Sequence, residues 1–237
     1  MNWKPLALGV LFLISCIFYY QLTANVVSET TYYNVTRVID GDTLELEIDQ
    51  KVRFLGINTP EKGFPYSKEA TKFLSNKVLG KKIQIESYGS DKYGRILAHV
   101  FVGKEHINEE ILEAGLASLY YYEKDEYYDE MKQAEEFARI NEKGIWKKSP
   151  NAPCLEIVTF QYKEKTKRCS NEEILTLRNN CDYKLNITFK DDATHIYKEL
   201  ISSNSQITRN FSCIWNDEGD TIYFSDSEGL LIFYRYE

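Results

Sequence analysis

The chain has 237 residues, of which 43% are hydrophobic and 27% are charged, which is the composition of a folded protein rather than a disordered one. Its length suits one large domain or two small ones, and we expect two. The formal net charge is −7, and residues 32–150 and 151–237 each carry more acidic than basic side chains. This charge argues against a protein that holds nucleic acid on a broad basic face, because that takes clustered lysines and arginines.

The N-terminal part carries an apolar run over residues 6–20, directly after a lysine and a proline. The run has the length of a signal-peptide core and is shorter than the roughly 20 residues that span a bilayer comfortably. We therefore expect residues 1–31 to be a cleaved signal, or an uncleaved membrane anchor with a tether. The letters LISC, which end at Cys16, leave lipidation as a third alternative. Each alternative predicts a protein outside the cell, either secreted or attached to the membrane.

Residues 32–150 carry two kinds of hydrophobic pattern. Alternation of apolar and polar residues predicts five strands, over residues 33–39, 43–48, 51–57, 82–88 and 95–102. Helical spacing of apolar residues predicts three helices, over residues 65–79, 108–114 and 127–142. This order suits an α+β fold that is mainly β, a five-stranded OB-type β-barrel with three helices around it.

Residues 149–154 contain two prolines and small polar residues, which mark a boundary. Beyond it the helical signal disappears, and four strand-like runs cover residues 155–162, 172–179, 184–191 and 220–226. We expect residues 151–237 to form a second domain, a compact β-sandwich or barrel. This part also holds four of the five cysteines, Cys154, Cys169, Cys181 and Cys213. They predict two disulfides with three possible pairings, with buried free thiols as the plainer alternative.

Three short segments at the ends of predicted strands concentrate charged and polar residues. They are IDGDT at 39–43, RFLGINTPE at 53–61 and DKYGR at 91–95. Taken singly, each has a plain interpretation as a turn or as a solvated strand face. Together, in loops that a barrel presents at one mouth, they favour a shared site.

The residue types in these segments suit hydrolysis of a phosphodiester bond. Hard oxygen ligands for calcium are available from Asp42, the Asn58 side chain and the Thr59 carbonyl. Two guanidinium groups, those of Arg53 and Arg95, suit the phosphate oxygens as charge grows in the transition state. Glu61 suits the proton of an attacking water.

Over residues 35–147, about half of the chain, the sequence resembles the thermonuclease (staphylococcal nuclease-like) family. The resemblance covers IDGDT, NTPE, DKYGR, EEILEAGLA and the closing GIW. It implies a calcium-dependent endonuclease that hydrolyses DNA or RNA. It also implies individual roles: metal ligation by Asp42 with Asp40 in support, a calcium ligand from the Thr59 carbonyl, a phosphate grip by Arg53 and Arg95, and a general base at Glu61.

By the same resemblance, the nucleotide pocket would be lined by Lys92 and by Tyr120, Tyr121 and Tyr122. Asn58 stands where the best-known members have a second metal-binding aspartate. Its amide still offers an oxygen but removes one negative charge, so we expect weaker calcium binding.

Residues 213–232 resemble part of a lamin-tail domain, an immunoglobulin-like β-sandwich, which implies adhesion to nucleic acid, to the envelope or to another protein. Within it, NDEGD and DSEG predict the turns of a β-hairpin. A calcium loop made by Asp217, Glu218 and Asp220 is the alternative to this hairpin. Two other functions stay open for the whole chain. One is a catalytically weak or inactive protein that binds single strands by stacking on the three tyrosines, and the other is an envelope adhesion protein. In each case we expect a monomer.

Overall fold

The computed structural model describes residues 31–121, 123–162, 173–191, 195–212, 214–215 and 219–236. The expected export segment lies, apart from its last residue, outside these ranges. In the part that is described, no helix is both long enough and apolar enough to cross a membrane. Residues Tyr33–Glu237 form one compact unit.

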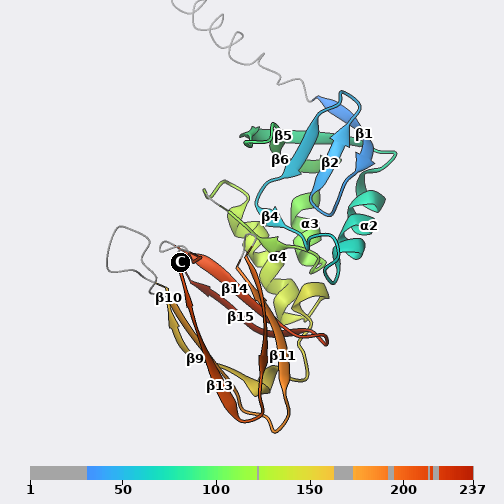
Figure 1. Cartoon of the computed structure of the whole chain (residues 1–237). Helices are drawn as coiled ribbons and strands as arrows, with labels where there is room; N and C mark the ends of the chain where they lie inside the picture. Colours follow the sequence, from blue (N-terminus) through green and yellow to red (C-terminus); the bar gives the residue numbers. More distant parts are fainter. Residues whose placement is uncertain are drawn as a thin grey trace, which may run out of the picture. The chain divides into compact units, whose positions relative to one another are not determined.

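Five strands close a barrel at the N-terminal side of this unit (Figure 1): β1 (Tyr32–Val38), β2 (Thr43–Leu46), β3 (Lys51–Phe54), β5 (Lys82–Ser90) and β6 (Ile96–Val102). They pair in the order β3-β2-β1-β5-β6, and a parallel pairing of β3 with β6 closes the ring. A short strand, β7 (Glu105–His106), pairs with β6 outside the ring. The predicted five-stranded barrel is confirmed.

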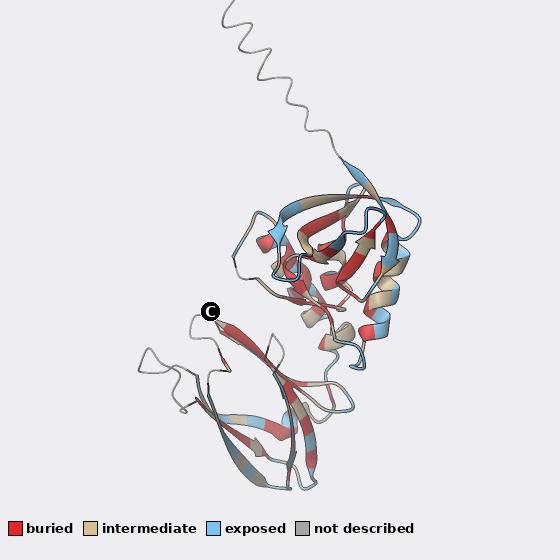
Figure 2. Ribbon diagram, turned by 45° about the horizontal axis from the view of Figure 1, so that its top comes forward, coloured by how far each residue is buried: buried red, intermediate tan, exposed pale blue. Residues whose placement is uncertain are grey.

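The three predicted helices are also present, as α2 (Ser67–Val78), α3 (Ile107–Glu113) and α4 (Tyr128–Ile140). Helix α2 begins two residues later than expected, because Tyr66 has a left-handed backbone conformation (φ 67°) that no helix continues. The apolar face of α2 is fully buried through Ala70, Leu74 and Val78, which join the core of the barrel. Figure 2 shows this burial as red segments on the inner sides of the helices and strands.

A separate two-stranded ladder fixes the segment that leaves the barrel after β3. It consists of β4 (Ile57–Asn58) and β8 (Ser118–Leu119), with Ile57 opposite Leu119 and Asn58 opposite Ser118. The Leu119 amide donates to the buried Glu135 carboxylate of α4 at 2.8 Å. The backbone around Asn58 is therefore held from both the ladder and the helix behind it.

Seven further strands form two antiparallel sheets: β9 (Leu155–Gln161), β10 (Glu173–Asn179), β11 (Leu185–Lys190), β12 (Ile196–Ile201), β13 (Ser205–Phe211), β14 (Asp220–Ser225) and β15 (Leu230–Tyr236). The sheets have the orders β13-β10-β9 and β12-β11-β14-β15, and side chains from both share one core. Ile222 and Phe224 of β14 face this core, whereas Tyr223 packs on the other side with Trp146. Strands β12, β13 and β15 were not among the predicted runs.

One disulfide joins Cys154 to Cys181, on either side of β9 and β10. Cys154 ends the short 3-10 helix η2 (Ala152–Cys154) and is 3% exposed. The predicted presence of a disulfide is confirmed for this pair. Cys169 and Cys213 lie outside the described residues, as do Asp217 and Glu218 of the alternative calcium loop.

The helices beside the barrel and the C-terminal sheets share a second, smaller core. Ala138 of α4 and Trp146 of the 3-10 helix η1 (Gly144–Trp146) are buried against Tyr223. Residues 147–149, which follow η1, run alongside the start of β15. The Leu230 amide donates to the Lys147 carbonyl and the Ser149 amide donates to the Leu230 carbonyl, both at 2.8 Å. The C-terminal sheets are therefore packed onto α4 and η1.

Candidate active site

The turn between β1 and β2 places Asp42 inside the protein. Its backbone is closed by the Ile39 amide, which donates to the Thr43 carbonyl at 2.9 Å, and the Asp40 carboxylate accepts from the Asp42 amide at 3.1 Å. Gly41 has no room for a side chain, since a Cβ there would lie 2.6 Å from the Cβ of Ala70. The IDGDT segment is thus a turn, as its plain interpretation predicts, and it also leaves Asp42 only 6% exposed.

The Asp42 carboxylate brings two of the three predicted segments together. Its Oδ2 accepts from the amide and the hydroxyl of Thr59, both at 2.9 Å. Its Oδ1 accepts from the Thr43 hydroxyl at 3.1 Å and lies 3.2 Å from Nε of Arg53. Burial and the nearby negative charge of Asp42 raise the pKa of Asp40. Two acidic side chains therefore share a confined space, which favours positive charge beside them.

The surroundings of Arg53 show that it is not part of a solvated strand face. Its side chain is only 13% exposed, although the strand around it alternates toward solvent. Besides Asp42, it contacts the Asn58 side-chain oxygen, with 3.5 Å from Nη2 to Oδ1. The carboxylate of Asp42 and the amide oxygen of Asn58 therefore converge on one cationic group.

The donor set at this point fits calcium by its chemistry, since carboxylate, amide and carbonyl oxygens are ligands that calcium prefers. Thr59, which the sequence assigned to calcium through its carbonyl, is 5% exposed and bonded to Asp42. Among the described residues, no three His, Cys, Asp or Glu side chains converge as a metal site. A cation between Asp42 and Asn58 would therefore depend on neutral oxygens for much of its coordination.

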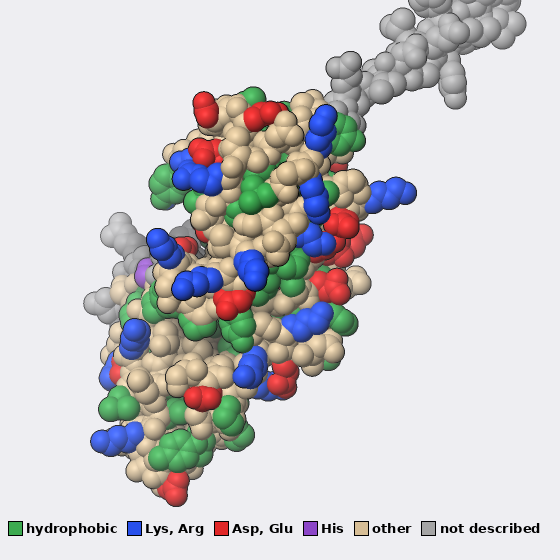
Figure 3. Space-filling model, turned by 90° about the vertical axis from the view of Figure 1, so that its right-hand side faces the viewer, with side chains coloured by type: hydrophobic (Ala, Val, Ile, Leu, Met, Phe, Trp, Pro, Cys, Tyr) green, Lys and Arg blue, Asp and Glu red, His purple; other side chains and the backbone are tan. Residues whose placement is uncertain are grey.

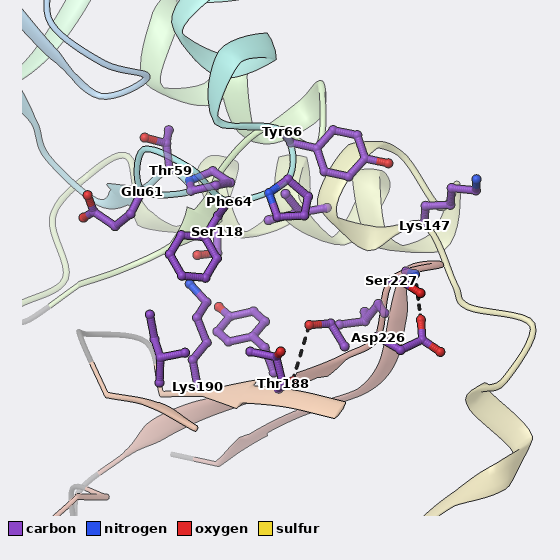
Figure 4. A pocket seen from close by; sticks show the side chains of 18 of the residues that line it. Thr59, Glu61, Phe64, Tyr66, Ser118, Lys147, Thr188, Lys190, Asp226 and Ser227 are labelled. Carbon is purple, nitrogen blue, oxygen red and sulfur yellow. Dashed lines mark hydrogen bonds between the residues drawn. The ribbon is translucent and has the colours of Figure 1, made fainter. Parts of the chain in front are cut away.

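Glu61 is an exposed residue in the loop that follows β4, three positions after Asn58. The loop turns here, because the Phe64 amide donates to the Glu61 carbonyl at 3.0 Å. Glu61, Asn58 and Thr59 all line one cavity of about 630 Å³. In Figure 4, Glu61 and Thr59 lie on the same loop along one wall of this cavity. Glu61 is therefore exposed two positions after Thr59, the residue that binds Asp42.

Arg95 directly precedes β6, the strand that pairs with β3 and its Arg53. Leu97 of β6, two positions after Arg95, lies opposite Arg53. Its guanidinium is held within its own loop by Asp91, with 2.6 Å from Nε to Oδ2. Burial acts to raise the pKa of Asp91, but hydrogen bonds from Arg95 and Tyr93 outweigh it and the pKa is lowered. Asp91 is not among the predicted site residues, although an aspartate four positions before an arginine in a turn is a recognisable signal.

The remaining predicted residues lie around these two loops. Lys92 is exposed, and its ammonium lies 5.1 Å from the centre of the Tyr93 ring. Tyr120 is half-buried, and its amide donates to the Gly56 carbonyl at 2.9 Å. Tyr122 lies outside the described residues.

Tyr121 is a core contact in this structure rather than an open stacking surface. Its ring lies against Gly56, where an added Cβ would be 2.4 Å away. Its hydroxyl donates to Asp125 at 3.1 Å and contacts the Met131 sulfur at the same distance. Burial, together with the charge of Asp125, raises the pKa of the Tyr121 hydroxyl.

Comparison with known proteins identifies the family of this chain. Residues 51–148 match the family model described as staphylococcal nuclease homologue. The chain is 37% identical over 126 residues to a thermonuclease of Staphylococcus hyicus, covering 48% of this chain and 75% of the relative. It is 34% identical over 128 residues to a thermonuclease of Staphylococcus intermedius, covering 49% and 76%. An endonuclease of Bacillus subtilis (strain 168) is 37% identical over 132 residues, covering 49% and 63%. The chain therefore belongs to the staphylococcal nuclease family and is a nuclease, a hydrolase of nucleic acid.

Proposed function

We propose that this nuclease is a calcium-dependent phosphodiesterase whose reaction takes place beside Asp42. The observation that carries the proposal is the buried cluster in which Asp42 binds Thr59 and Arg53 together. A phosphodiester is a poor electrophile because it is negatively charged, so its hydrolysis needs positive groups at fixed positions. Asp42, Asn58 and Thr59 would hold the metal, and Arg53 and Arg95 would bind the phosphate.

The proposal gives Glu61 and the two arginines separate parts in the reaction. Glu61, exposed in the loop after β4, takes a proton from a water that attacks phosphorus. Arg53 and Arg95 donate to the phosphate oxygens as the pentacoordinate transition state gains charge, and the bond to the leaving oxygen breaks. Calcium, when bound, would neutralise negative charge on the phosphate. Arg53 would then exchange its contact with Asn58 for one with the substrate.

A broad electrostatic attraction plays little part in this proposal. On the face drawn in Figure 3, the lysine and arginine side chains of the described residues are interspersed with acidic ones. With a net charge of −7, substrate binding would rest on a few placed cations and the metal.

We place this activity outside the cell, secreted or membrane-attached through residues 1–31, on the strength of the apolar run alone. Fractionation of expressing cells, with the protein followed by antibody in medium, membrane and cytosol, tests this location. Recovery of the full-length chain only from the cytosol would exclude an extracellular location.

We also propose that residues 151–237 are a lamin-tail-like β-sandwich domain.

The mechanism is tested by cleavage of single-stranded DNA and RNA with the parent protein and with Glu61→Gln and Arg95→Ala. Both variants should lose at least about a hundredfold in kcat, as is typical when a general base or a charge-stabilising donor is removed. Lys81→Gln, an exposed change after α2, is the matched control and should cleave normally. Parent-like activity in the Glu61 and Arg95 variants would exclude the assigned roles.

A further inference from the structure

The cavity beside Glu61 has a second wall that comes from the C-terminal sheets. Its first wall consists of Asn58 at the end of β4 and of the loop after it, through Glu61 and Phe64. Its second wall includes Thr188 and Lys190 of β11 and Tyr223 of β14. We call this space the shared cavity. At about 630 Å³, it is within the size range of ligand-binding pockets.

The second wall of the shared cavity carries one lysine, Lys190, as well as the acidic Asp226 and Glu228. Lys190 extends from β11 toward Phe64 on the opposite wall (Figure 4), and its ammonium lies 5.0 Å from the centre of the Tyr223 ring. A second lysine, Lys147, also lines the cavity, from the segment that connects α4 to the C-terminal sheets. Neither lysine lies in the three predicted site segments.

The first wall offers aromatic surface. Phe64 is 38% exposed although it is a large apolar residue, and Tyr66 beside it is half-buried. Both lie in the loop that carries Glu61, and both line the shared cavity. Cationic side chains that face exposed aromatic rings are the combination by which proteins hold single-stranded nucleic acid.

We propose that the shared cavity binds the part of a single-stranded nucleic acid that continues beyond the cleaved phosphate. In this arrangement Lys190 binds a backbone phosphate and Phe64 packs against a base or sugar. The inference rests on the proposed function, because the cavity adjoins Asn58, Thr59 and Glu61. It gives the C-terminal sheets a direct part in substrate binding.

Acidic side chains also line the cavity. The Asp226 carboxylate is hydrogen-bonded within the protein, since it accepts from the Ser149 hydroxyl and the Asn151 side-chain amide, both at 2.8 Å. Glu69 and Glu228 are exposed at the cavity and carry charge that opposes a polyanion. Replacing one of them by a cation should therefore strengthen binding at the same place where Lys190 acts.

The test compares two substrates in the full-length protein, a long single-stranded DNA oligonucleotide and a nitrophenyl ester of thymidine phosphate that reaches only the catalytic cluster. The readout is the ratio of kcat/KM for the long strand to kcat/KM for the short ester. Lys190→Glu should lower this ratio about tenfold, the effect of losing one charged hydrogen bond. Glu228→Lys should raise it, and Lys184→Glu, the same charge change at the exposed residue just before β11, should leave it unchanged.

Salt dependence gives a second measurement on the same variants. If Lys190 binds a phosphate, the slope of log KM for the long strand against log salt should be smaller by about 0.7 in Lys190→Gln than in the parent. An unchanged ratio and an unchanged slope, with both substrates still cleaved, would overturn this inference and leave the proposed function intact. Failure of the parent to cleave either substrate in calcium would overturn both.

Discussion

Arg235, in the last strand of the chain, forms a buried ion pair with Glu135 of α4, one hundred residues earlier in the sequence. Nη2 of Arg235 lies 2.9 Å from Oε1 of Glu135, whose side chain is 1% exposed. Burial acts to lower the pKa of Arg235, but the Glu135 carboxylate outweighs it and the pKa is raised. The same carboxylate accepts from the Leu119 amide, so the pair links the C-terminal sheets to the ladder that carries Asn58.

Removing the arginine should destabilise the protein strongly. Arg235→Met leaves the Glu135 carboxylate buried without its cation, and we expect the free energy of unfolding to fall by about 3 kcal/mol. Urea unfolding followed by tryptophan fluorescence measures the change. Adding Glu135→Gln should recover part of the loss, because the amide oxygen still accepts from Leu119. Arg178→Met, in an exposed pair with Glu156, should cost less than about 1 kcal/mol. Equal losses in the two arginine variants would contradict this account.

The stability should fall in acid through His106. Burial, reinforced by His99, lowers the pKa of His106 from 6.5 to about 4. The facing groups are His99 at 3.0 Å, Glu109 at 3.7 Å and the rings of Phe101 and Tyr127, and Asp125 opposes the shift.

Between these two pKa values the unfolded chain binds a proton that the folded chain does not. This contribution to stability is therefore present above pH 6.5 and is lost as the pH falls toward 4. It amounts to about 3 kcal/mol. In His106→Gln, the free energy of unfolding should depend less steeply on pH over this window, as measured by urea unfolding at several pH values. If the free energy of unfolding of His106→Gln depended on pH as steeply as that of the parent, His106 would be ruled out as the cause.

The Cys154–Cys181 disulfide should stabilise the C-terminal sheets, because it closes a loop across a sequence separation of 27. The double change Cys154→Ser and Cys181→Ser should cost about 3 kcal/mol in the free energy of unfolding. Mass spectrometry of unreduced peptides should find these two cysteines linked to each other. A peptide that links Cys154 to Cys169 or Cys213 would contradict the pairing.

Gly56 should tolerate no side chain, for two separable reasons. Its φ of 76° is strained for other residues, and a Cβ would lie 2.4 Å from the ring of Tyr121. Gly56→Ala should cost at least about 2 kcal/mol in unfolding free energy. Gly103→Ala is the matched control, since its φ is 63° and nothing lies within 4 Å of an added Cβ, so only the backbone cost of about 1 kcal/mol applies. Equal losses would mean that the Tyr121 contact is unimportant.

The elements of the barrel could be predicted because their signal is local. Helix α2 shows its buried face within one stretch of sequence, and Gly80 marks its end. Strands β12 and β13 could not be found in the same way. Polar residues such as Lys198, Glu199 and Gln206 occupy much of them, and their burial depends on the neighbouring sheet.

In the candidate site, too, some features could be predicted from the local sequence and others could not. The spacing of IDGDT and RFLGINTPE led to Asp42 and Arg53, which the structure brings to 3.2 Å. The inward direction of the Tyr121 ring depends on the gap left by Gly56, and no local pattern reveals it. The ion pair of Arg235 with Glu135 depends on how the C-terminal sheets pack against α4, which is a property of the tertiary structure alone.

The most direct test of the proposed mechanism is a calcium titration of cleavage on matched DNA and RNA, with the parent and with Asn58→Asp. We predict that cleavage by the parent rises to saturation with calcium and stops in EGTA. Asn58→Asp should reach half-saturation at lower calcium, because it adds a charged oxygen ligand. Full cleavage in EGTA, or an identical calcium dependence in the two proteins, would contradict a metal held between Asp42 and Asn58.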